Sequence, residues 1–591
     1  MSPFRYYLLI LAISLLGLGL TFSMAVRETS FTTMSDKSPF LSDPFLQFPT
    51  PTSVRVVWFT EFRGLRHEVT AGNQTYIANT TRLSRTREDK NSQTPNRENS
   101  DRPQHREVWR HEAEVSGLTP GKHVPYFVSS QREDSEISNS AEFSLAATPK
   151  PGTPLKILLT SDHQLMPMTA ANLQKAFETV GAIDAVFHAG DLVNVPDRAS
   201  EWFDDGDGNA FFPCLQGYAS YDLEKDGVTT RYRGAPIIQN APLFPTIGNH
   251  EVMGRYSQVR TLDEQFNDAI ARSAVKDWYD RDPKAANITG DPGLREAWMK
   301  TYSFNTDTFE ELFSIPEKYP GGKTYYAASF GDVRLVVLFA TNIWRKPQTD
   351  ETVKGRYQER TDDLDNPMAW GYGQHIFEPI DRGSPQYEWL ERELTSPEFQ
   401  SAKYKIVMLH HPPHTLGGNI VPPYTNPVPK IDRDDDGNLL AVRYEYPKAD
   451  DYLVRDVIPL LESAGVQLVY FGHSHLWNRF VSDRGTHYLE SSNVGNTYGA
   501  FWKTERRKVL RENDPNYRAQ GDPNGLEPVF PSIAPLRDES GSPLPYVASN
   551  DITAFSVFET ETGTVASYYF DTRNPNSEVV KFDEFQLHSE E

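Results

Sequence analysis

Five apolar runs in the sequence each end in a short cluster of polar residues that could bind a metal ion. The runs are residues 156–160, 185–189, 243–247, 404–409 and 466–471, and the clusters contain Asp162, Asp191, Asn249, His410, His473 and His475. Carboxylate, amide and imidazole groups are all metal ligands, and imidazole suits Zn, Mn and Fe. His473 and His475 stand two residues apart, so at a strand end both can reach one point. One such cluster is weak evidence, because Asp and Asn are common in turns, but five in order indicate a metal site.

The elements that must position these residues alternate between strand and helix. Residues 170–180 and 451–463 have helical spacing and lie between the apolar runs, which predicts an α/β domain. Sites in open α/β sheets form outside the carboxyl ends of the strands. The six side chains are enough to hold two hydrated metal ions. Residues 552–559 and 564–571 alternate like two edge strands joined at Gly563.

A different pattern precedes this region. Residues 53–62, 108–115, 123–129 and 141–145 are short β-rich segments, and a Gly/Pro turn at 117–121 separates two of them. Short strands with such turns predict a small all-β sandwich, which we assign to residues 40–147. Three prolines and a glycine mark a linker at 148–155. Residues 82–106 are polar and charged, and we expect a long solvated loop there.

Composition limits the function and the cellular location. The chain has 591 residues and a net charge of -22, which argues against nucleic acid or an anionic membrane as partner. Arg5, the apolar residues 6–22 and Ser23-Met24-Ala25 predict a signal peptide over residues 1–25, and an uncleaved anchor is the alternative. We therefore expect a secreted or periplasmic protein, without stable membrane insertion unless the signal is retained. Cys214 is the only cysteine, so the chain forms no internal disulfide.

The ordered motifs resemble those of the calcineurin-like metallophosphoesterase superfamily. They are Asp162, GDLVN (190–194), GNHE (248–251), HHP (410–412) and GHSH (472–475). The segments 386–413 and 472–479 resemble purple acid phosphatases in particular, and residues 114–128 are similar to a turn of fibronectin type III domains. The resemblance implies a four-layer α/β/β/α catalytic domain over residues 156–572, with a loose acidic tail at 573–591.

The resemblance also implies the roles of individual residues. Asp162 and His475 would hold one ion, Asn249, His410 and His473 would hold the second, and Asp191 would bridge them. The ions would lower the pKa of a bound water, so that hydroxide attacks phosphorus. His250 would serve as general acid or transition-state donor. The side chains expected to contact substrate are His250, His411, His414 and Tyr498.

Two positions depart from the pattern of the resembling families. Purple acid phosphatases place a ferric-iron tyrosine three residues after the bridging aspartate, and Asn194 stands there in this chain. Other members place His two residues after the first aspartate, where this chain has Gln164, with His163 displaced by one. Gln164 offers a carbonyl oxygen, and His163 points away if the backbone stays extended, so we expect Gln164 as the ligand. The ions would then be divalent Zn, Mn, Fe or Ca rather than ferric iron.

Two acidic tracts could bind structural calcium. Asp432, Asp434, Asp436 and Gly437 match positions 1, 3, 5 and 6 of a calcium loop, but position 12 is Arg443 instead of Glu. Asp205, Asp207 and Asn209 repeat the acidic spacing. Both tracts are also compatible with solvated turns.

Taken with the resemblance, the residues predict an exported binuclear-metal phosphatase that hydrolyses phosphate monoesters, similar to acid phosphatases. A phosphodiesterase or nucleotide hydrolase on the same site is the alternative within enzymes, because the metal site treats both alike. A noncatalytic cell-envelope binding protein is the alternative of another class. Small phosphate esters are the expected partners.

Overall fold

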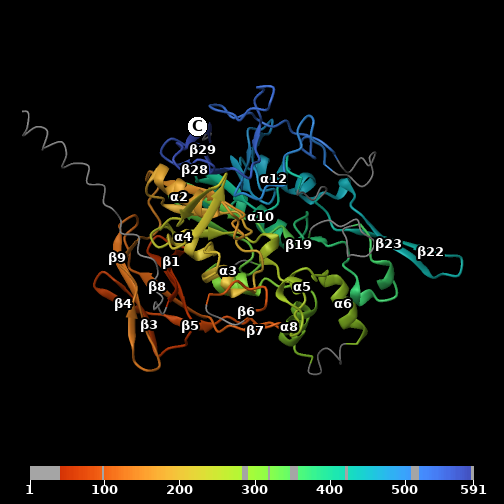
Figure 1. Ribbon diagram of the computed structural model, residues 1–591, viewed down its shortest axis with the longest axis horizontal. Helices are drawn as coiled ribbons and strands as arrows, with labels where there is room; N and C mark the ends of the chain where they lie inside the picture. The colour runs from red at the N-terminus through yellow and green to blue at the C-terminus, as the bar shows by residue number, and fades with distance from the viewer. Residues whose placement is uncertain are drawn as a thin grey trace, which may run out of the picture. The chain divides into compact units, whose positions relative to one another are not determined.

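The N-terminal strands form two antiparallel sheets that pack against each other (Figure 1). One sheet contains β1 (Phe40–Gln47), β2 (Ser53–Thr60), β8 (Trp109–Ser116) and β5 (Asn79–Arg82), and the other contains β10 (Ile137–Asn139), β9 (Val124–Gln131), β3 (Arg66–Ala71), β4 (Gln74–Ile77) and β11 (Phe143–Leu145). Trp58 Nε1 donates to Ser130 Oγ at 3.0 Å and joins the two sheets. Buried side chains alternate with more exposed ones along β3 and β9, as expected for sheets with one solvated face. The predicted all-β sandwich is confirmed.

The rest of the chain is built on two mixed sheets. The first has the order β16 (Leu243–Pro245), β13 (Ala185–His188), β12 (Lys156–Thr160), β28 (Ile552–Glu559), β29 (Thr564–Asp571) and β30 (Val580–Gln586). The second has the order β17 (Tyr326–Phe330), β18 (Val333–Val337), β21 (Tyr404–Met408), β24 (Leu468–Phe471), β26 (His487–Ser491), β25 (Trp477–Val481) and β27 (Tyr546–Val547). Because β12, β13 and β16 are parallel, as are β21 and β24, their carboxyl ends meet at shared edges.

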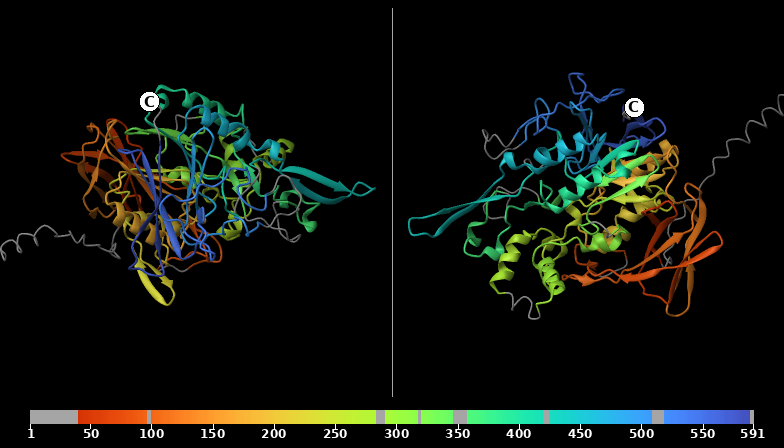
Figure 2. Two further views of the ribbon diagram at one scale, coloured as in Figure 1. Left: turned by 90° about the horizontal axis from the view of Figure 1, so that it is seen from above. Right: turned by 180° about the vertical axis from the view of Figure 1, so that it is seen from behind.

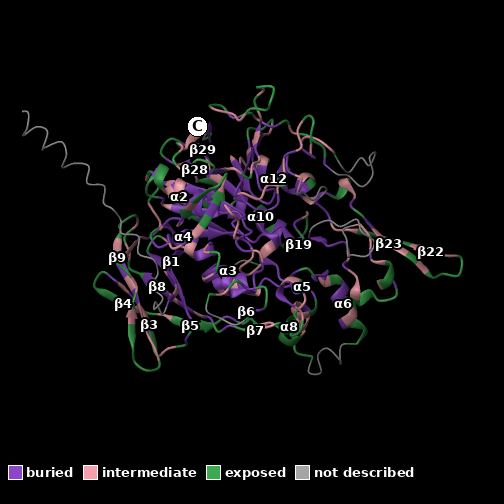
Figure 3. Cartoon of the chain, viewed as in Figure 1, coloured by how far each residue is buried: buried purple, intermediate pink, exposed green. Residues whose placement is uncertain are grey.

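The two mixed sheets face each other through polar and aromatic contacts. Trp477 Nε1 donates to Ser567 Oγ at 3.0 Å, and Ser556 Oγ donates to Ser491 Oγ at 3.0 Å. Buried residues concentrate in these strands (Figure 3). Helix α2 (Thr169–Val180) packs on β28, whereas α10 (Pro385–Leu394) and α12 (Ile458–Ser463) contact the second sheet. The order helix, sheet, sheet, helix confirms the predicted α/β/β/α architecture.

Shorter elements lie between the strands of these sheets. The further helices are α3 (Ala199–Phe203), α4 (Phe211–Gln216), α5 (Leu262–Phe266), α6 (Arg272–Arg281), α8 (Pro292–Tyr302), α9 (Asp307–Leu312) and α11 (Pro397–Gln400). The small two-stranded sheets are β6 (Arg87–Glu88) with β7 (Gln104–His105), β14 (Tyr221–Lys225) with β15 (Val228–Tyr232), β19 (Thr341–Trp344) with β20 (His375–Phe377), and β22 (Val428–Arg433) with β23 (Leu439–Glu445). The hairpin of β22 and β23 projects from its neighbours in every view (Figure 2).

The computed structural model describes residues 40–95, 99–282, 290–316, 320–345, 357–418, 424–507 and 518–587. The predicted signal peptide at 1–25 lies outside these ranges. Within them, no helix has both the length and the apolar character that a membrane crossing requires.

The C-terminal strands differ from the sequence prediction. The bounds of β28 and β29 agree with it residue for residue, but neither strand is an edge, because β28 pairs with β12 and β29 pairs with β30. The prediction of a loose tail is therefore wrong for Val580–Gln586. Phe582 of β30 is buried. Asp583 is also buried, and its charge is neutralised by an ion pair of 2.9 Å with Arg479.

The prediction of a solvated loop at 82–106 is wrong for residues 86–89 and for Arg106, whereas Arg102, Gln104 and His105 are exposed. Arg87, Glu88, Asp89 and Arg106 are all buried, with Asp89 fully inaccessible. Arg106 forms two bonds of 2.7 Å with the carboxylate of Asp204, far along the chain. Low hydrophobicity suggested exposure, but charges can be buried when each one meets an opposite charge.

We expect the sandwich to lose stability below neutral pH because it buries two neutral imidazoles. His67 and His111 stack at 3.6 Å. Burial lowers the pKa of His67, and burial with the adjacent His67 and Arg110 lowers the pKa of His111 to about 2. The unfolded state therefore binds these protons first as pH falls below about 6.5, and each fully shifted group costs about 1.4 kcal/mol per pH unit.

Urea unfolding at pH 7.5 and 5.5 will test this, with tryptophan fluorescence as the readout. The His111→Gln variant should lose less stability over this interval than the wild type. His123→Gln, at an exposed position, is the matched control and should behave as the wild type. Equal losses in the wild type and the His111 variant would contradict the prediction.

Candidate metal centre

The five predicted ligand clusters converge at the carboxyl ends of their strands. Asp162 follows β12, Asp191 follows β13, Asn249 begins the 3₁₀ turn after β16, His410 and His411 follow β21, and His473 and His475 follow β24. All of these side chains are buried. Hydrogen bonds between the loops bring them together: the Asp162 N–H donates to Gly190 O at 3.0 Å, and the His473 N–H donates to the Asp162 carboxylate at 2.9 Å.

One group of candidate ligands consists of Asp162, Asp191 and His475. A ligand atom of each lies within 4.8 Å of those of the other two. His475 Nε2 is 3.3 Å from Asp162 Oδ1, the pair that the sequence assigns to one ion. Two carboxylates and an imidazole form a donor set with the negative charge that a divalent cation requires.

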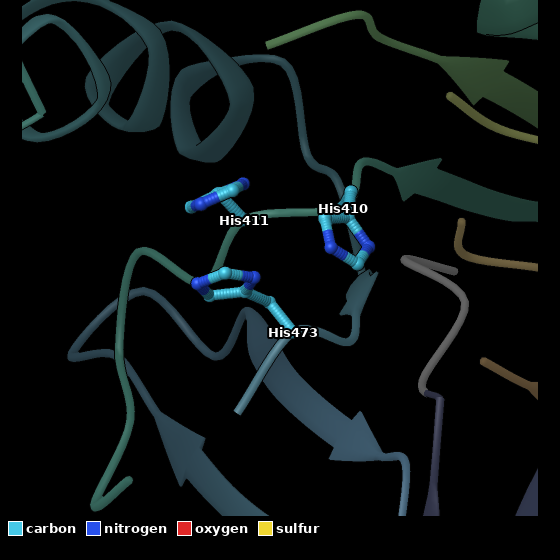
Figure 4. A group of neighbouring side chains, drawn as sticks. All are labelled: His410, His411 and His473. Carbon is cyan, nitrogen blue, oxygen red and sulfur yellow. The ribbon is translucent and has the colours of Figure 1, made fainter. Parts of the chain in front are cut away.

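A second group consists of His410, His411 and His473, whose imidazoles gather in Figure 4. His410 Nδ1 donates to Ala189 O at 2.8 Å, which turns Nε2 toward Asp191 Oδ2 at 3.1 Å. A backbone acceptor on one ring nitrogen commonly fixes the tautomer of a metal-binding histidine. Asp191 therefore lies between the two groups, as the bridging role requires.

His411 belongs to this second group, although the sequence assigned it to the substrate. Its ring centroid lies 3.8 Å from that of His473, and its Nδ1 is 2.7 Å from Thr341 Oγ1. Its buried Nε2 has no hydrogen-bond partner among the described residues. The structure thus offers His411 as an additional candidate ligand.

Two amide oxygens complete the neighbourhood of the ligand groups. Asn249 Oδ1 and Gln164 Oε1 are both buried and unpartnered within the described residues. Gln164 Nε2 is 3.4 Å from Asp191 Oδ2, whereas His163 turns away to Thr160 Oγ1 at 2.8 Å and to the ring of His188. Unpaired buried acceptors cost free energy, and bound cations would satisfy them. The residues present therefore fit a two-metal centre.

Electrostatics couple the two groups through Asp191. Burial alone would raise the pKa of Asp191, but His410 and His250 lower the pKa of this carboxyl below its usual range. Burial opposes a charge on His410, yet Asp191 raises the pKa of this imidazole to about 9. A cation placed between these groups would replace the proton in neutralising the carboxylate.

His250 stands beside the metal groups with its imidazole held in one orientation. Its backbone N–H donates to Asp191 Oδ1 at 2.9 Å. Its ring Nδ1 donates to Asn194 O at 2.8 Å. Burial lowers the pKa of His250 although Asp191 opposes this shift. With Nδ1 engaged, Nε2 is the atom that can exchange a proton.

The model of the calcineurin-like phosphoesterase family matches residues 155–476, more than half of the chain. The chain belongs to this family. Members of the family are metal-dependent phosphoesterases with two metal ions, which agrees with the two ligand groups. The resemblance inferred from the sequence motifs is therefore confirmed.

One solved structure shows a related fold, and a second match is weaker. The purple acid phosphatase PPD1 isolated from yellow lupin (Lupinus luteus) seeds is similar with a TM-score of 0.50 and 13% identity, covering 92% of this chain and 73% of that one. GAP50, the anchor in the inner membrane complex of Plasmodium, has a TM-score of 0.29 and 9% identity, covering 73% of this chain and 89% of that one. The search among curated proteins found no match.

Backbone conformation at the phosphoesterase site is unusual. Asp162, Gln164, Asp191, His473 and His475 all have φ between 39° and 80°, in the left-handed region. This conformation costs a non-glycine residue about 1–2 kcal/mol. Such strain is typical of functional sites and persists only where the surroundings hold it. The sequence prediction for Gln164 assumes an extended backbone, in which Gln164 and His163 point to opposite sides. The left-handed conformation of Asp162 and Gln164 shows that the backbone is not extended there, so the two side chains are separated by the turn itself.

Two buried carboxylates that the sequence analysis missed hold these strained loops. Glu251 accepts hydrogen bonds from the N–H groups of Asp191, Leu192 and Gly248 at 2.7–2.9 Å. Glu490 accepts from Ser474 N at 2.7 Å, inside the GHSH motif. Glu251 was visible in the motif GNHE, but its acceptor role depends on loops that only the fold brings together.

A buried arginine supports the loop of Asn249 from the other side, and it too was missed. Arg345 donates to the carbonyl oxygens of Asn249, Val252 and Phe266 at 2.8–3.3 Å. Burial lowers the pKa of Arg345 to about 9 although Asp191 opposes this. Its guanidinium lies over the Phe266 ring, which also packs against His250. Nothing in the local sequence around Arg345 indicated this position.

The two remaining candidate substrate residues differ. Tyr498 is 52% exposed, and its ring centroid lies 5.0 Å from that of His475, so it stands at the rim of the site. His414 is buried, and its Nδ1 pairs with Asp522 Oδ2 at 2.9 Å. The structure therefore does not bring His414 to the ligand groups, because Asp522 holds its ring elsewhere.

The carboxylates of the two acidic tracts form turn hydrogen bonds and an ion pair. Asp432 forms an ion pair of 2.7 Å with Arg443, the residue where a calcium loop has Glu. Asp434 Oδ1 accepts from the backbone of Asp436 and Asn438, so it closes the β22–β23 turn. In the other tract, Asp205 Oδ1 accepts from the Asp207 N–H at 3.0 Å, and Asn209 Nδ2 donates to Leu165 O. Asp434 and Asp205 therefore close turns and Asp432 pairs with Arg443, and structural calcium at these tracts stays a prediction.

We predict that Gly472→Ala disrupts the metal centre by sterics alone. A Cβ at Gly472 would overlap Ser161 Oγ and Asp162 Oδ2, and Asp162 is a candidate ligand. Displacing such a ligand should lower metal affinity and activity about 10- to 100-fold. Metal content by elemental analysis after dialysis is the measurement. Gly485→Ala, in an exposed turn with open space around it, is the control. Full metal content in the Gly472 variant would refute the prediction.

Proposed function

We propose that the protein is an exported phosphatase that hydrolyses phosphate monoesters with two divalent metal ions. The observation that carries the proposal is the placement of Asp191 between two groups of buried metal ligands. Family membership supports a metal-dependent phosphoesterase, and the choice of monoesters is the finer step that we add.

The proposed ligand sets follow from the contacts around Asp191. Asp162 and His475, with Gln164, would hold one ion, and His410 and His473, with Asn249 and His411, would hold the other. When bound, two ions shared by a carboxylate act as Lewis acids on a phosphate ester and lower the pKa of a coordinated water. Zn, Mn, Fe(II) and Ca are the candidates.

Divalent ions at both positions are supported by the contacts of Asn194. This residue stands where the resembling phosphatases have a ferric-iron tyrosine, and its Nδ2 donates to Gln164 O at 2.8 Å. An amide tied to the backbone in this way cannot supply a phenolate. The side chain instead fixes the loop that carries Gln164.

The chain's own residues supply binding and proton transfer. In its imidazolium form, with the Nδ1–H held by Asn194 O, His250 carries on Nε2 the proton that it can donate to a departing alkoxide. Tyr498 at the rim can contact the ester group of a substrate. Export is proposed from the apolar residues 6–22 of the sequence, which precede the described part of the chain.

We predict that Asp191→Asn and His473→Ala each abolish hydrolysis of 4-nitrophenyl phosphate. Each removes a member of a ligand group that acts as a unit, so the loss in kcat should be about 1,000-fold or more. Elemental analysis should show that the protein purified without added metal contains two ions per chain and that the variants lose metal. Asp432→Asn, in the projecting hairpin, should keep both activity and metal. Hydrolysis that survived both ligand substitutions would exclude this site as the catalytic one.

A substrate panel separates the monoesterase from its alternatives. The wild type should hydrolyse 4-nitrophenyl phosphate at least about tenfold faster, in kcat/KM, than bis(4-nitrophenyl) phosphate. Nucleoside monophosphates and triphosphates complete the panel. Activity on the diester alone would replace the proposal with a phosphodiesterase, and activity on none would favour a noncatalytic protein.

A further inference from the structure

Three consecutive residues of the N-terminal sandwich, Arg87, Glu88 and Asp89, reach the loop that follows the bridging aspartate. Arg87 Nη2 pairs with Asp197 Oδ2 at 2.8 Å. The Glu88 carboxylate accepts from the N–H and the hydroxyl of Ser200 at 2.8 and 3.0 Å. These contacts bury charged groups on both sides, so the two segments are held in one register.

Asp89 extends this contact to Arg198. The fully buried Asp89 carboxylate lies 3.5 Å from Arg198 Nη2, and it accepts from the Leu262 N–H at 2.5 Å. Arg198 in turn donates from Nη1 to Glu201 Oε1 at 2.8 Å. Nη2 of Arg198 also donates to Asp263 Oδ2 at 2.6 Å, so Asp89, Glu201 and Asp263 share one guanidinium, and loss of one carboxylate changes how the other two hold it.

Glu201 connects Arg198 to the loop that follows Asp191. Its Oε2 accepts from the N–H groups of Asn194 and Val195 at 2.7 and 2.9 Å. Burial raises the pKa of Glu201 to about 7 although Arg198 opposes this shift. Arg198 stabilises the charged form of Glu201, and this carboxylate accepts the two backbone hydrogen bonds.

Asn194 links this chain of contacts both to His250 and to Gln164. Its carbonyl oxygen accepts from His250 Nδ1 at 2.8 Å, and its Nδ2 donates to Gln164 O at 2.8 Å. A change in the Asn194 peptide would turn the His250 ring, because within the described part of the chain this hydrogen bond and the packing of Phe266 are what orient the imidazole. The strand-end motif alone does not contain this restraint.

We propose that Glu88 and Asp89 of the sandwich are positioning residues for His250, acting through Ser200, Arg198, Glu201 and the Asn194 carbonyl. This inference rests on the proposed phosphatase function. Under this proposal, residues of the sandwich contribute to the orientation of His250. Their effect falls on proton donation to the leaving group, and we expect metal content to be kept because Glu88 and Asp89 contact Ser200, Arg198 and Leu262 rather than a candidate ligand.

Leaving-group dependence tests the proposal. 4-Nitrophenolate departs readily without a proton, whereas the alkoxide of glycerol 2-phosphate requires one, so a misplaced acid slows the second substrate more. Glu88→Gln and Asp89→Asn should each lower kcat on glycerol 2-phosphate about tenfold, and kcat on 4-nitrophenyl phosphate about twofold or less. KM and metal content should stay as in the wild type.

A double-mutant cycle distinguishes positioning from general stability. In the His250→Asn background, Asp89→Asn should cause no further loss on glycerol 2-phosphate, because the group it positions is gone. Glu107→Gln is the matched control, because Glu107 lies in the same segment and pairs with Arg82 at the surface. It should match the wild type on both substrates. Ser200→Ala removes one bond to Glu88 without altering charge, and it should show the same selective loss if the charge variants fail to fold.

The outcomes separate this inference from the function on which it rests. Equal losses on both substrates, loss of metal, or an additive effect in the His250→Asn background would each overturn the positioning role while leaving the phosphatase in place. A folded wild type, loaded with Zn or Mn, that hydrolyses neither substrate would overturn the proposed function and this inference together.

Discussion

The structure depends on holding Asp191 at the end of β13 in a left-handed conformation. With φ of 54°, its carboxylate lies between the two ligand groups and its N–H points to Glu251. This arrangement costs backbone energy and buries negative charge. It persists because His410 and the His250 N–H contact the carboxylate, while Glu251 holds the loop. The fold is the framework that makes this local arrangement stable.

The same constraint explains why the site is built from so many separate segments. A carboxylate that serves two ions needs imidazoles on both sides, and no single strand supplies them. Parallel strands of two facing sheets place β13, β21 and β24 so that Asp191, His410 and His475 meet. Around them, Glu490 binds the backbone N–H of Ser474, and Arg345 binds the backbone carbonyl of Asn249. The loops that carry the ligands are therefore held by residues outside the two ligand groups.

The N-terminal sandwich is connected to this centre by buried charge. The segment that carries Glu88 and Asp89 has almost no apolar residues, yet it packs into the interior through an ion pair of Asp89 with Arg198 and a hydrogen bond from the Ser200 N–H to Glu88. Such pairs contribute little net stability compared with apolar contacts, but they fix orientation and register. Such contacts suit the proposed role of His250, because proton transfer depends on angle and distance.

The sequence determined the strands and the ligand types, because apolar runs ending in Asp, Asn and His report burial and donor chemistry locally. The bounds of β12, β28 and β29 followed from it, and the family resemblance of its motifs implied the pairing of Asp162 with His475. Only the tertiary structure decided what depends on distant partners. It placed His411 beside His473, turned His414 to Asp522, and buried residues 87–89 against the catalytic loop. A charged side chain is exposed or buried according to the opposite charge that folding brings to it, and local sequence does not contain that partner.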